Sequence, residues 1–209
     1  MTKIELLDLI EKYVPFGSPI YDAFKEIPRE EFVPEDLKKY AYENRPLPIG
    51  CGQTISQPTM ICMMLKVMDL KPFHKVLEIG TGSGYNAALL SKLVKEVYTI
   101  ERIPELSYKA KKVFEKLGLN NIKCKIGDGT LGWSEYAPYD RIIVTAGAPS
   151  IPQSLKSQLK IGGNLVIPVG SFYVQELLKV IKVGENDFKI EKYGGCVFVK
   201  LIGKEGWTE

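Results

Sequence analysis

A short apolar run that ends in three closely spaced glycines constrains the fold of this chain more than any other stretch. The residues are Val76-Leu77-Glu78-Ile79-Gly80-Thr81-Gly82-Ser83-Gly84-Tyr85. Apolar residues bounded by turn residues predict a buried strand, and the glycines allow a tight turn that a ligand can approach closely. A strand, a glycine turn and a following helix together predict a nucleotide-binding α/β unit.

The spacing of this glycine loop separates two classes of cofactor. The dinucleotide fingerprint is Gly-x-Gly-x-x-Gly, but Tyr85 stands at the position of its third glycine. Glu78, two positions before Gly80, would repel a pyrophosphate and could hold the ammonium group of an amino-acid moiety. The loop therefore favours S-adenosylmethionine over NAD. This stretch alone leaves a second interpretation open, a purely structural turn that binds no cofactor.

Predicted strands and helices alternate around the glycine loop. Strands are predicted at residues 97–101, 122–126, 141–144 and 164–169, and helices at residues 58–69, 87–95, 104–117 and 152–160. Residues 1–50 predict a helical N-terminal extension, and residues 176–183 and 188–201 predict a β-hairpin. We expect one α/β domain over residues 1–209, doubly wound with a mostly parallel Rossmann-like sheet and a C-terminal antiparallel hairpin within residues 170–209.

Acidic residues follow two of the predicted strands. Glu101 ends the strand at residues 97–101, where a carboxylate can accept both ribose hydroxyls of an adenosine. Asp128, between Gly127 and Gly129, follows the next strand and could accept a hydrogen bond from the exocyclic amine of adenine. The alternatives are a surface carboxylate for Glu101 and a simple turn for Asp128.

A polar, glycine-rich segment, Gly50-Cys51-Gly52-Gln53-Thr54-Ile55-Ser56-Gln57-Pro58, leads into the predicted helix at residues 58–69. Free backbone N–H groups and hydroxyls would gather at the start of this helix, which suits a bound carboxylate. The alternative is that Ser56 only caps the helix. The methionines further along, such as Met64 and Met68, are expected to pack in the core.

Composition limits the remaining possibilities. A net charge of +3 makes no case for a nucleic-acid or anionic-membrane surface. No apolar run approaches the roughly 20 residues that span a bilayer, and the first residues lack a signal-peptide core, so we expect a cytoplasmic protein. The 4 cysteines are scattered and His74 is the 1 histidine, so no metal site is expected. His74 is expected at the surface.

Several motifs together resemble the protein-L-isoaspartate (D-aspartate) O-methyltransferase family, from about Ile27 to the C-terminus. They are the stretches at residues 27–34, 45–50, 52–58, 76–85, 127–129, 137–140, 162–163 and 168–170. Many methyltransferases share the glycine loop, whereas residues 53–58 are far more particular to this family. The resemblance implies a single class I S-adenosylmethionine-dependent methyltransferase domain.

The resemblance also implies an activity. The enzyme would transfer a methyl group from S-adenosylmethionine to the α-carboxylate of an L-isoaspartyl residue in a damaged protein or peptide, leaving S-adenosylhomocysteine. The methyl ester would then collapse to a succinimide, whose hydrolysis returns some normal aspartate. No metal, nucleic acid or membrane is implied, and we favour a monomer.

The resemblance assigns roles residue by residue. Ser56 is the catalytic-site residue, and it would orient the substrate carboxylate rather than act as a nucleophile. The residues expected near the cofactor are Thr54, Ile55, Ser56, Gln57, Glu78, Gly80, Thr81, Gly82, Glu101, Arg102, Asp128 and Gly129. Substrate contacts are expected from Ser56, Val197, Phe198 and Val199. Lys200 departs from the family, which usually has proline there, and Ile202 occupies a position that can carry a polar residue.

Two other interpretations are open. One is a methyltransferase that acts on RNA or a small molecule, although Thr145-Ala146-Gly147-Ala148-Pro149 replaces the Asp/Asn-Pro-Pro-Tyr/Phe loop of many enzymes that methylate nitrogen. The other is a noncatalytic cofactor-binding module. An intact glycine loop beside an intact Ser56 segment argues against it.

Overall fold

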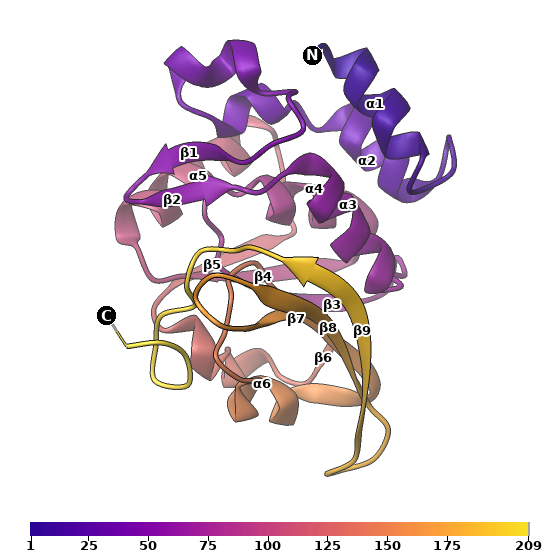
Figure 1. Cartoon of the computed structure of the whole chain (residues 1–209), viewed down its shortest axis with the longest axis vertical. Coiled ribbons are helices and arrows are strands. Elements are labelled where there is room, and N and C mark those ends of the chain that lie inside the picture. Colours follow the sequence, from indigo (N-terminus) through magenta and orange to yellow (C-terminus); the bar gives the residue numbers. More distant parts are fainter. Residues whose placement is uncertain (209) are drawn as a thin grey trace.

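A seven-stranded sheet in the order β5-β4-β3-β6-β7-β8-β9 forms the centre of the computed structural model, which describes residues 1–208 (Figure 1). The parallel strands are β3 (Lys75–Ile79), β4 (Glu96–Glu101), β5 (Ile122–Ile126), β6 (Tyr139–Val144) and β7 (Leu159–Gly170). The antiparallel strands β8 (Gln175–Lys182) and β9 (Phe188–Cys196) complete one edge. The predicted fold class is therefore confirmed. The strand order reverses between β3 and β6, which is where open α/β sheets bind ligands.

Side-chain alternation along the central strands divides the core between the two faces of the sheet. Val76 lies in the cluster that includes α3 (Pro58–Val67), α4 (Tyr85–Leu93) and α5 (Pro104–Lys116), whereas Leu77 lies in the cluster that includes α6 (Gln153–Ser157). Both side chains are fully buried. This strand thus has no solvent face, as expected for a parallel sheet with helices on both sides.

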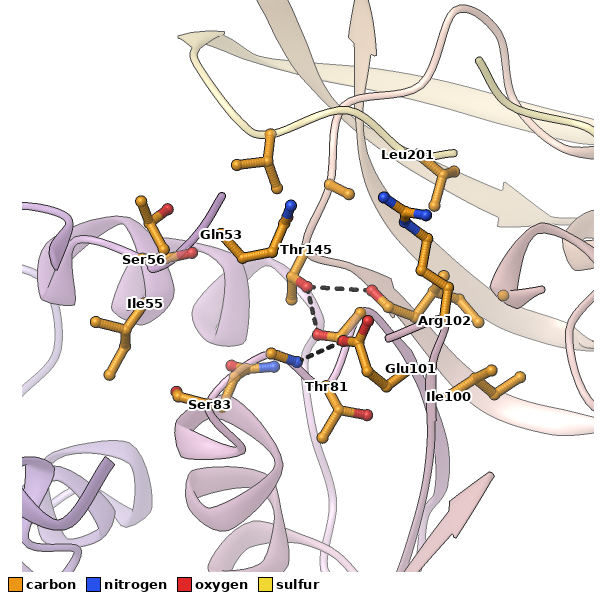
Figure 2. A pocket seen from close by; sticks show the side chains of 18 of the residues that line it. Gln53, Ile55, Ser56, Thr81, Ser83, Ile100, Glu101, Arg102, Thr145 and Leu201 are labelled. Atoms are coloured by element: carbon orange, nitrogen blue, oxygen red, sulfur yellow. Dashed lines mark hydrogen bonds between the residues drawn. The ribbon is translucent and has the colours of Figure 1, made fainter. Parts of the chain in front are cut away.

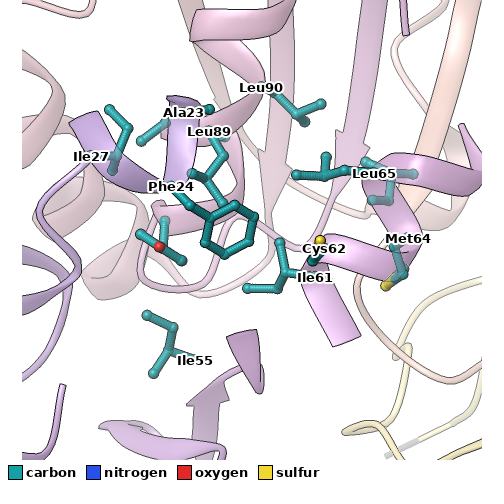
Figure 3. Packing of buried hydrophobic residues seen from close by; sticks show 14 of the residues in the cluster. Ala23, Phe24, Ile27, Ile55, Ile61, Cys62, Met64, Leu65, Leu89 and Leu90 are labelled. Carbon is teal, nitrogen blue, oxygen red and sulfur yellow. The ribbon is translucent and has the colours of Figure 1, made fainter. Parts of the chain in front are cut away.

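An N-terminal layer covers the face that carries α3 and α4. It contains α1 (Lys3–Glu11), α2 (Pro19–Glu26) and two short 3-10 helices, Arg29–Phe32 and Glu35–Tyr40. Phe24 and Ile27 of this layer pack with Ile61 of α3 and Leu89 of α4 (Figure 3). A hairpin of β1 (Leu47–Gly50) and β2 (Gln53–Ile55) then connects the layer to α3.

Four expectations need correction. The helix expected at residues 152–160 is shorter, because Leu159 already pairs with Tyr139 and begins β7. The hairpin strand expected to reach residue 201 ends at Cys196, after which the chain leaves β8. The extended segment before α3 contains a hairpin that was not predicted. His74 is buried rather than at the surface, and its Nδ1 accepts a hydrogen bond from the Lys71 N–H at 3.0 Å.

Within residues 1–208, no helix is long and apolar enough to cross a membrane. The same residues hold no group of three or more His, Cys, Asp or Glu side chains that could bind a metal ion. The buried cysteines Cys62 and Cys196 and the half-buried Cys124 are free thiols, as is the exposed Cys51.

Candidate active site

The glycine loop turns sharply between β3 and α4. Gly80, with φ 93°, leaves no room for a side chain, because a Cβ there would lie 2.6 Å from the Thr145 hydroxyl oxygen. That hydroxyl donates to the Gly80 carbonyl at 2.7 Å, so β6 holds the loop from behind. Gly84, with φ 90°, packs against the Phe114 ring of α5 at a position where a Cβ would lie 2.7 Å from two ring atoms. These contacts explain why the loop requires glycine at both positions.

Glu101 ties the loop to the end of β4. One carboxylate oxygen accepts the Gly82 N–H at 2.8 Å (Figure 2). The other accepts the Ile103 N–H at 3.0 Å. The side chain is nearly buried, yet it lines the pocket beside the loop. Each oxygen keeps acceptor capacity for a further donor, such as a ribose hydroxyl.

A buried polar network lies behind the loop. The Glu78 carboxylate accepts hydrogen bonds from Asn86 Nδ2 at 2.7 Å and from Thr99 Oγ1 at 2.5 Å. The Thr99 hydroxyl also lies 2.6 Å from that of Thr81. Complete burial raises the pKa of the Glu78 carboxyl to about 7, and the two hydrogen bonds oppose this shift. Glu78 therefore supports the loop from inside the protein instead of lining the pocket.

Ser56 lies at the junction between β2 and α3. The N-cap residue of α3 is Gln57, whose side chain makes no capping hydrogen bond, and Asn44 Oδ1 instead accepts the Thr59 N–H at 3.1 Å. The interpretation of Ser56 as a helix cap is therefore wrong. Within residues 1–208 the Ser56 hydroxyl has no hydrogen-bond partner, while its backbone carbonyl accepts from Arg29 Nη2 at 2.9 Å. The hydroxyl is free to meet a ligand.

One cavity of about 750 Å³, part of it open to solvent, connects these features. In Figure 2, Ile55 and Ser56 lie on one side and Glu101, Arg102 and Leu201 on the other. The predicted site residues that line the cavity are Thr54, Ile55, Ser56, Gly80, Thr81, Gly82, Glu101, Arg102, Gly129 and Val199.

Five predicted site residues do not line this cavity. Gln57 donates from Nε2 to the Asn44 carbonyl, and Glu78 belongs to the buried network. Asp128 uses its carboxylate to accept from Thr130 and from the Lys204 N–H, so it holds the C-terminal segment. The other two, Val197 and Phe198, lie just outside the stretch from Val199 to Ile202 that lines the cavity.

The C-terminal segment after β9 completes the cavity by pairing with the loop that follows β6. The Gly147 N–H donates to the Val199 carbonyl at 2.7 Å, and the Leu201 N–H donates to the Gly147 carbonyl at 2.9 Å. These bonds bring Lys200 to the cavity edge, with its ammonium 4.1 Å from the centre of the exposed Phe172 ring. No carboxylate pairs with this ammonium within residues 1–208.

Sequence reasoning missed several lining residues, notably Gln53, Asn86 and Thr145. Thr145 follows a parallel strand at the ligand-binding edge, a position that could have indicated it. Asn86 carries a buried Oδ1 with no hydrogen-bond partner among residues 1–208. An unpaired acceptor beside the glycine loop and a carboxylate at the end of β4 fit the ammonium and ribose groups of S-adenosylmethionine.

Comparisons with known proteins agree with this geometry. The family model for protein-L-isoaspartate(D-aspartate) O-methyltransferase matches residues 2–206. A protein-L-isoaspartate O-methyltransferase from Pyrococcus horikoshii is 54% identical over 189 residues, which covers 90% of this chain and 86% of the relative. One from Dictyoglomus turgidum is 54% identical over 204 residues, covering 98% of this chain and 92% of the relative.

Solved structures show the same likeness. A structure titled protein-L-isoaspartate O-methyltransferase superimposes with a TM-score of 0.89 at 31% identity, covering 98% of this chain and 67% of that one. A Plasmodium falciparum protein, titled a putative enzyme of this kind in complex with S-adenosyl-L-homocysteine, has a TM-score of 0.84 at 23% identity, covering 97% and 99% of the two chains. At that identity, the second match shows the fold alone.

Proposed function

The chain belongs to the protein-L-isoaspartate(D-aspartate) O-methyltransferase family. From this membership we propose which of its residues bind the cofactor and which orient the substrate. The enzyme transfers a methyl group from S-adenosylmethionine to the α-carboxylate of L-isoaspartyl residues in damaged proteins and peptides. The observation that carries our assignment is the free Ser56 hydroxyl in the same cavity as the glycine loop and Glu101.

Residues at the strand ends would hold the cofactor. Glu101 would accept the ribose hydroxyls, Gly80 and Gly82 would border the methionine portion, and Gly129 would lie against the adenine. A Cβ at Gly129 would lie 2.5 Å from Ile79 Cγ2, so only glycine leaves this wall of the cavity in place. When bound, S-adenosylmethionine supplies the methyl group from its sulfonium. The proposed contacts of Thr54, Ile55, Gln57, Glu78, Thr81, Arg102 and Asp128 belong to the same assignment, those of Gln57, Glu78 and Asp128 being indirect.

Ser56 would orient the substrate. An α-carboxyl group titrates near pH 3.5 and is already anionic at neutral pH, so it attacks a sulfonium methyl without a general base. The Ser56 hydroxyl can donate one hydrogen bond to such a carboxylate and so hold one oxygen in line with the methyl group. Correct placement alone is worth up to roughly 7 to 11 kcal/mol in good model systems.

The C-terminal segment would receive the peptide on either side of the isoaspartyl residue. Val199 lines the cavity, and Val197 is 72% exposed, so a peptide can reach this segment from solvent. The Phe198 N–H donates to Gln175 Oε1 at 2.8 Å, which fixes the segment to β8. We place Val197, Phe198 and Val199 beside the substrate backbone.

We propose that residues 1–209 act as one catalytic domain in the cytoplasm, as a monomer that requires neither nucleic acid nor a membrane. The mild net charge of +3 and the continuity of the buried core from α1 to β9 support this view.

The test offers methyl-labelled S-adenosylmethionine and two peptides that are identical except for an aspartyl or isoaspartyl linkage. Base-labile methyl esters on the isoaspartyl peptide alone are the expected result. Label on both peptides would contradict the proposed selectivity for the isoaspartyl linkage. Label on neither, with cofactor binding confirmed by calorimetry, would indicate another acceptor or a noncatalytic role.

A further inference from the structure

Arg29 is a buried cation in the N-terminal layer that the reaction described above does not use. It has no exposed surface, although it lies in the short 3-10 helix Arg29–Phe32. Its Nε donates to the Ala41 carbonyl at 2.8 Å, and its Nη2 donates to the Ser56 carbonyl at 2.9 Å. One guanidinium thus joins the N-terminal layer to the segment that carries the proposed catalytic hydroxyl.

The charge of Arg29 has no anionic partner. Its Nη1 is buried and has no hydrogen-bond partner, and no carboxylate pairs with the guanidinium, within residues 1–208. The carboxylate of the neighbouring Glu30 instead accepts a hydrogen bond from the Tyr42 hydroxyl. Burial lowers the pKa of Arg29 to about 10, so the side chain stays protonated at neutral pH. An unpaired buried charge is costly to the folded state, which calls for a compensating role.

Arg29 also borders the cavity wall. Its guanidinium carbon lies 4.9 Å from the centre of the Tyr85 ring, and Tyr85 lines the cavity together with Ser56. A buried cation is screened much less than one at the surface. Its potential therefore extends to the place where the Ser56 hydroxyl would meet an anionic group.

We propose that Arg29 is a positioning residue for the substrate: it fixes Ser56 through the backbone carbonyl, and its unpaired charge favours the anionic α-carboxylate bound at the Ser56 hydroxyl. This inference rests on the proposed role of Ser56. It identifies the N-terminal layer as part of the substrate-binding machinery.

Three variants test this role, and Arg141 provides the matched control. Arg141 is also nearly buried, and it donates to the carbonyls of Met68, Asp69 and Asp140 near the opposite ends of the strands. Arg29→Met and Arg141→Met each remove a buried guanidinium that binds backbone carbonyls. Arg29→Lys keeps the charge but cannot reach both carbonyls with one ammonium.

The measurements are kcat and KM for an isoaspartyl peptide, the cofactor dissociation constant and the melting temperature, each at a temperature where the variant is folded. We expect Arg29→Met to lower kcat/KM roughly 10- to 100-fold more than Arg141→Met, because both the position of Ser56 and the charge are lost. The cofactor dissociation constant should change less than about threefold, since a different set of residues holds the cofactor. Arg29→Lys should keep KM within about twofold of wild type and lower kcat about three- to tenfold.

Equal losses of kcat/KM in Arg29→Met and Arg141→Met would show that Arg29 only stabilises the fold. An Arg29→Lys variant with wild-type kcat would contradict the positioning role, and it decides the matter if Arg29→Met does not fold. The proposed function fails separately, because in that case the wild-type enzyme itself would not esterify the isoaspartyl peptide.

Discussion

The two sides of the active site are built in different ways. On the cofactor side, the glycine loop, Glu101 and Thr145 lie at the ends of β3, β4 and β6. The ends of these adjacent strands lie together in any such sheet. On the substrate side, Ser56 and Val199 belong to segments outside the sheet, held by Arg29 and Gly147. The cofactor side therefore depends on the sheet, and the substrate side depends on a few contacts between residues distant in the chain.

This difference separates two kinds of failure. Damage on the cofactor side should appear in cofactor affinity or in the stability of the sheet, because the loop and its buried network are part of the core. Damage on the substrate side should appear in turnover, because the β1–β2 hairpin and the C-terminal segment lie outside the seven-stranded sheet. The following predictions test this separation.

The largest expected effect is on stability and involves Glu78. Its pKa is raised to about 7 by burial, above the ordinary value of 4.5, so the folded protein binds the extra proton. Its contribution to stability is complete below about pH 4.5 and is lost as the pH rises towards about 7, by roughly 3 kcal/mol in the free energy of unfolding. Urea unfolding of wild type and Glu78→Gln across this pH range should show this fall in the free energy of unfolding in wild type alone. The same pH dependence in both proteins would show that Glu78 does not cause it.

Ser56→Ala tests the substrate side directly. Loss of a hydrogen bond to a charged group should lower turnover roughly 10- to 100-fold. The cofactor dissociation constant should stay within about twofold of wild type, because residues at the strand ends provide most of the cofactor contacts. Ser83→Ala is the control, since Ser83 also lines the cavity but lies in the glycine loop. Unchanged turnover in Ser56→Ala would exclude Ser56 from the mechanism.

Glu101→Ala tests the cofactor side. Loss of the ribose contact should weaken cofactor binding by about 1 to 3 kcal/mol, while turnover at saturating cofactor stays near wild type. Glu105→Ala removes an exposed carboxylate at the start of α5 and should leave the dissociation constant unchanged. Isothermal titration calorimetry measures the cofactor dissociation constant of each variant. An unaltered dissociation constant in Glu101→Ala would contradict the placement of the ribose at Glu101.

The smallest expected effect concerns Lys200, at the outer edge of the substrate side. Peptides with a glutamate close to the isoaspartyl residue should react about two- to fivefold faster, as kcat/KM, than those with glutamine, a preference that salt weakens. Lys200→Met should abolish the preference. Lys156→Met, which removes a lysine 5.2 Å from the centre of the Phe188 ring, should not. The same preference in wild type and Lys200→Met would show that Lys200 does not contact the peptide.

The same division explains what could be predicted from the sequence. Gly80 and Glu101 were found because strand ends follow from hydrophobic pattern, and parallel strands bring their ends together. Ser56 could not be distinguished from a helix cap by its local sequence, and its proposed role came from the family resemblance. Arg29 belongs to the family motif at residues 27–34, but that motif does not indicate its proposed role, which depends on a contact 27 residues along the chain.

The errors also have physical causes. His74 looked like a surface residue because it is polar and precedes a strand, but its side chain is turned inward to bind the Lys71 N–H. The strand expected to reach residue 201 ends early, because the segment after Cys196 pairs with Gly147 instead of β8. Such tertiary competition for backbone hydrogen bonds is not visible in a single segment.

The most direct test of the central claim combines Ser56→Ala and Glu101→Ala in one chain and measures both cofactor affinity and turnover at saturating cofactor. Independent sides predict that the double variant binds cofactor as weakly as Glu101→Ala, and turns over as slowly as Ser56→Ala, each within about twofold. A double variant that departs from these values by tenfold or more, a factor equivalent to about 1.4 kcal/mol of coupling, would contradict the separation of the two sides.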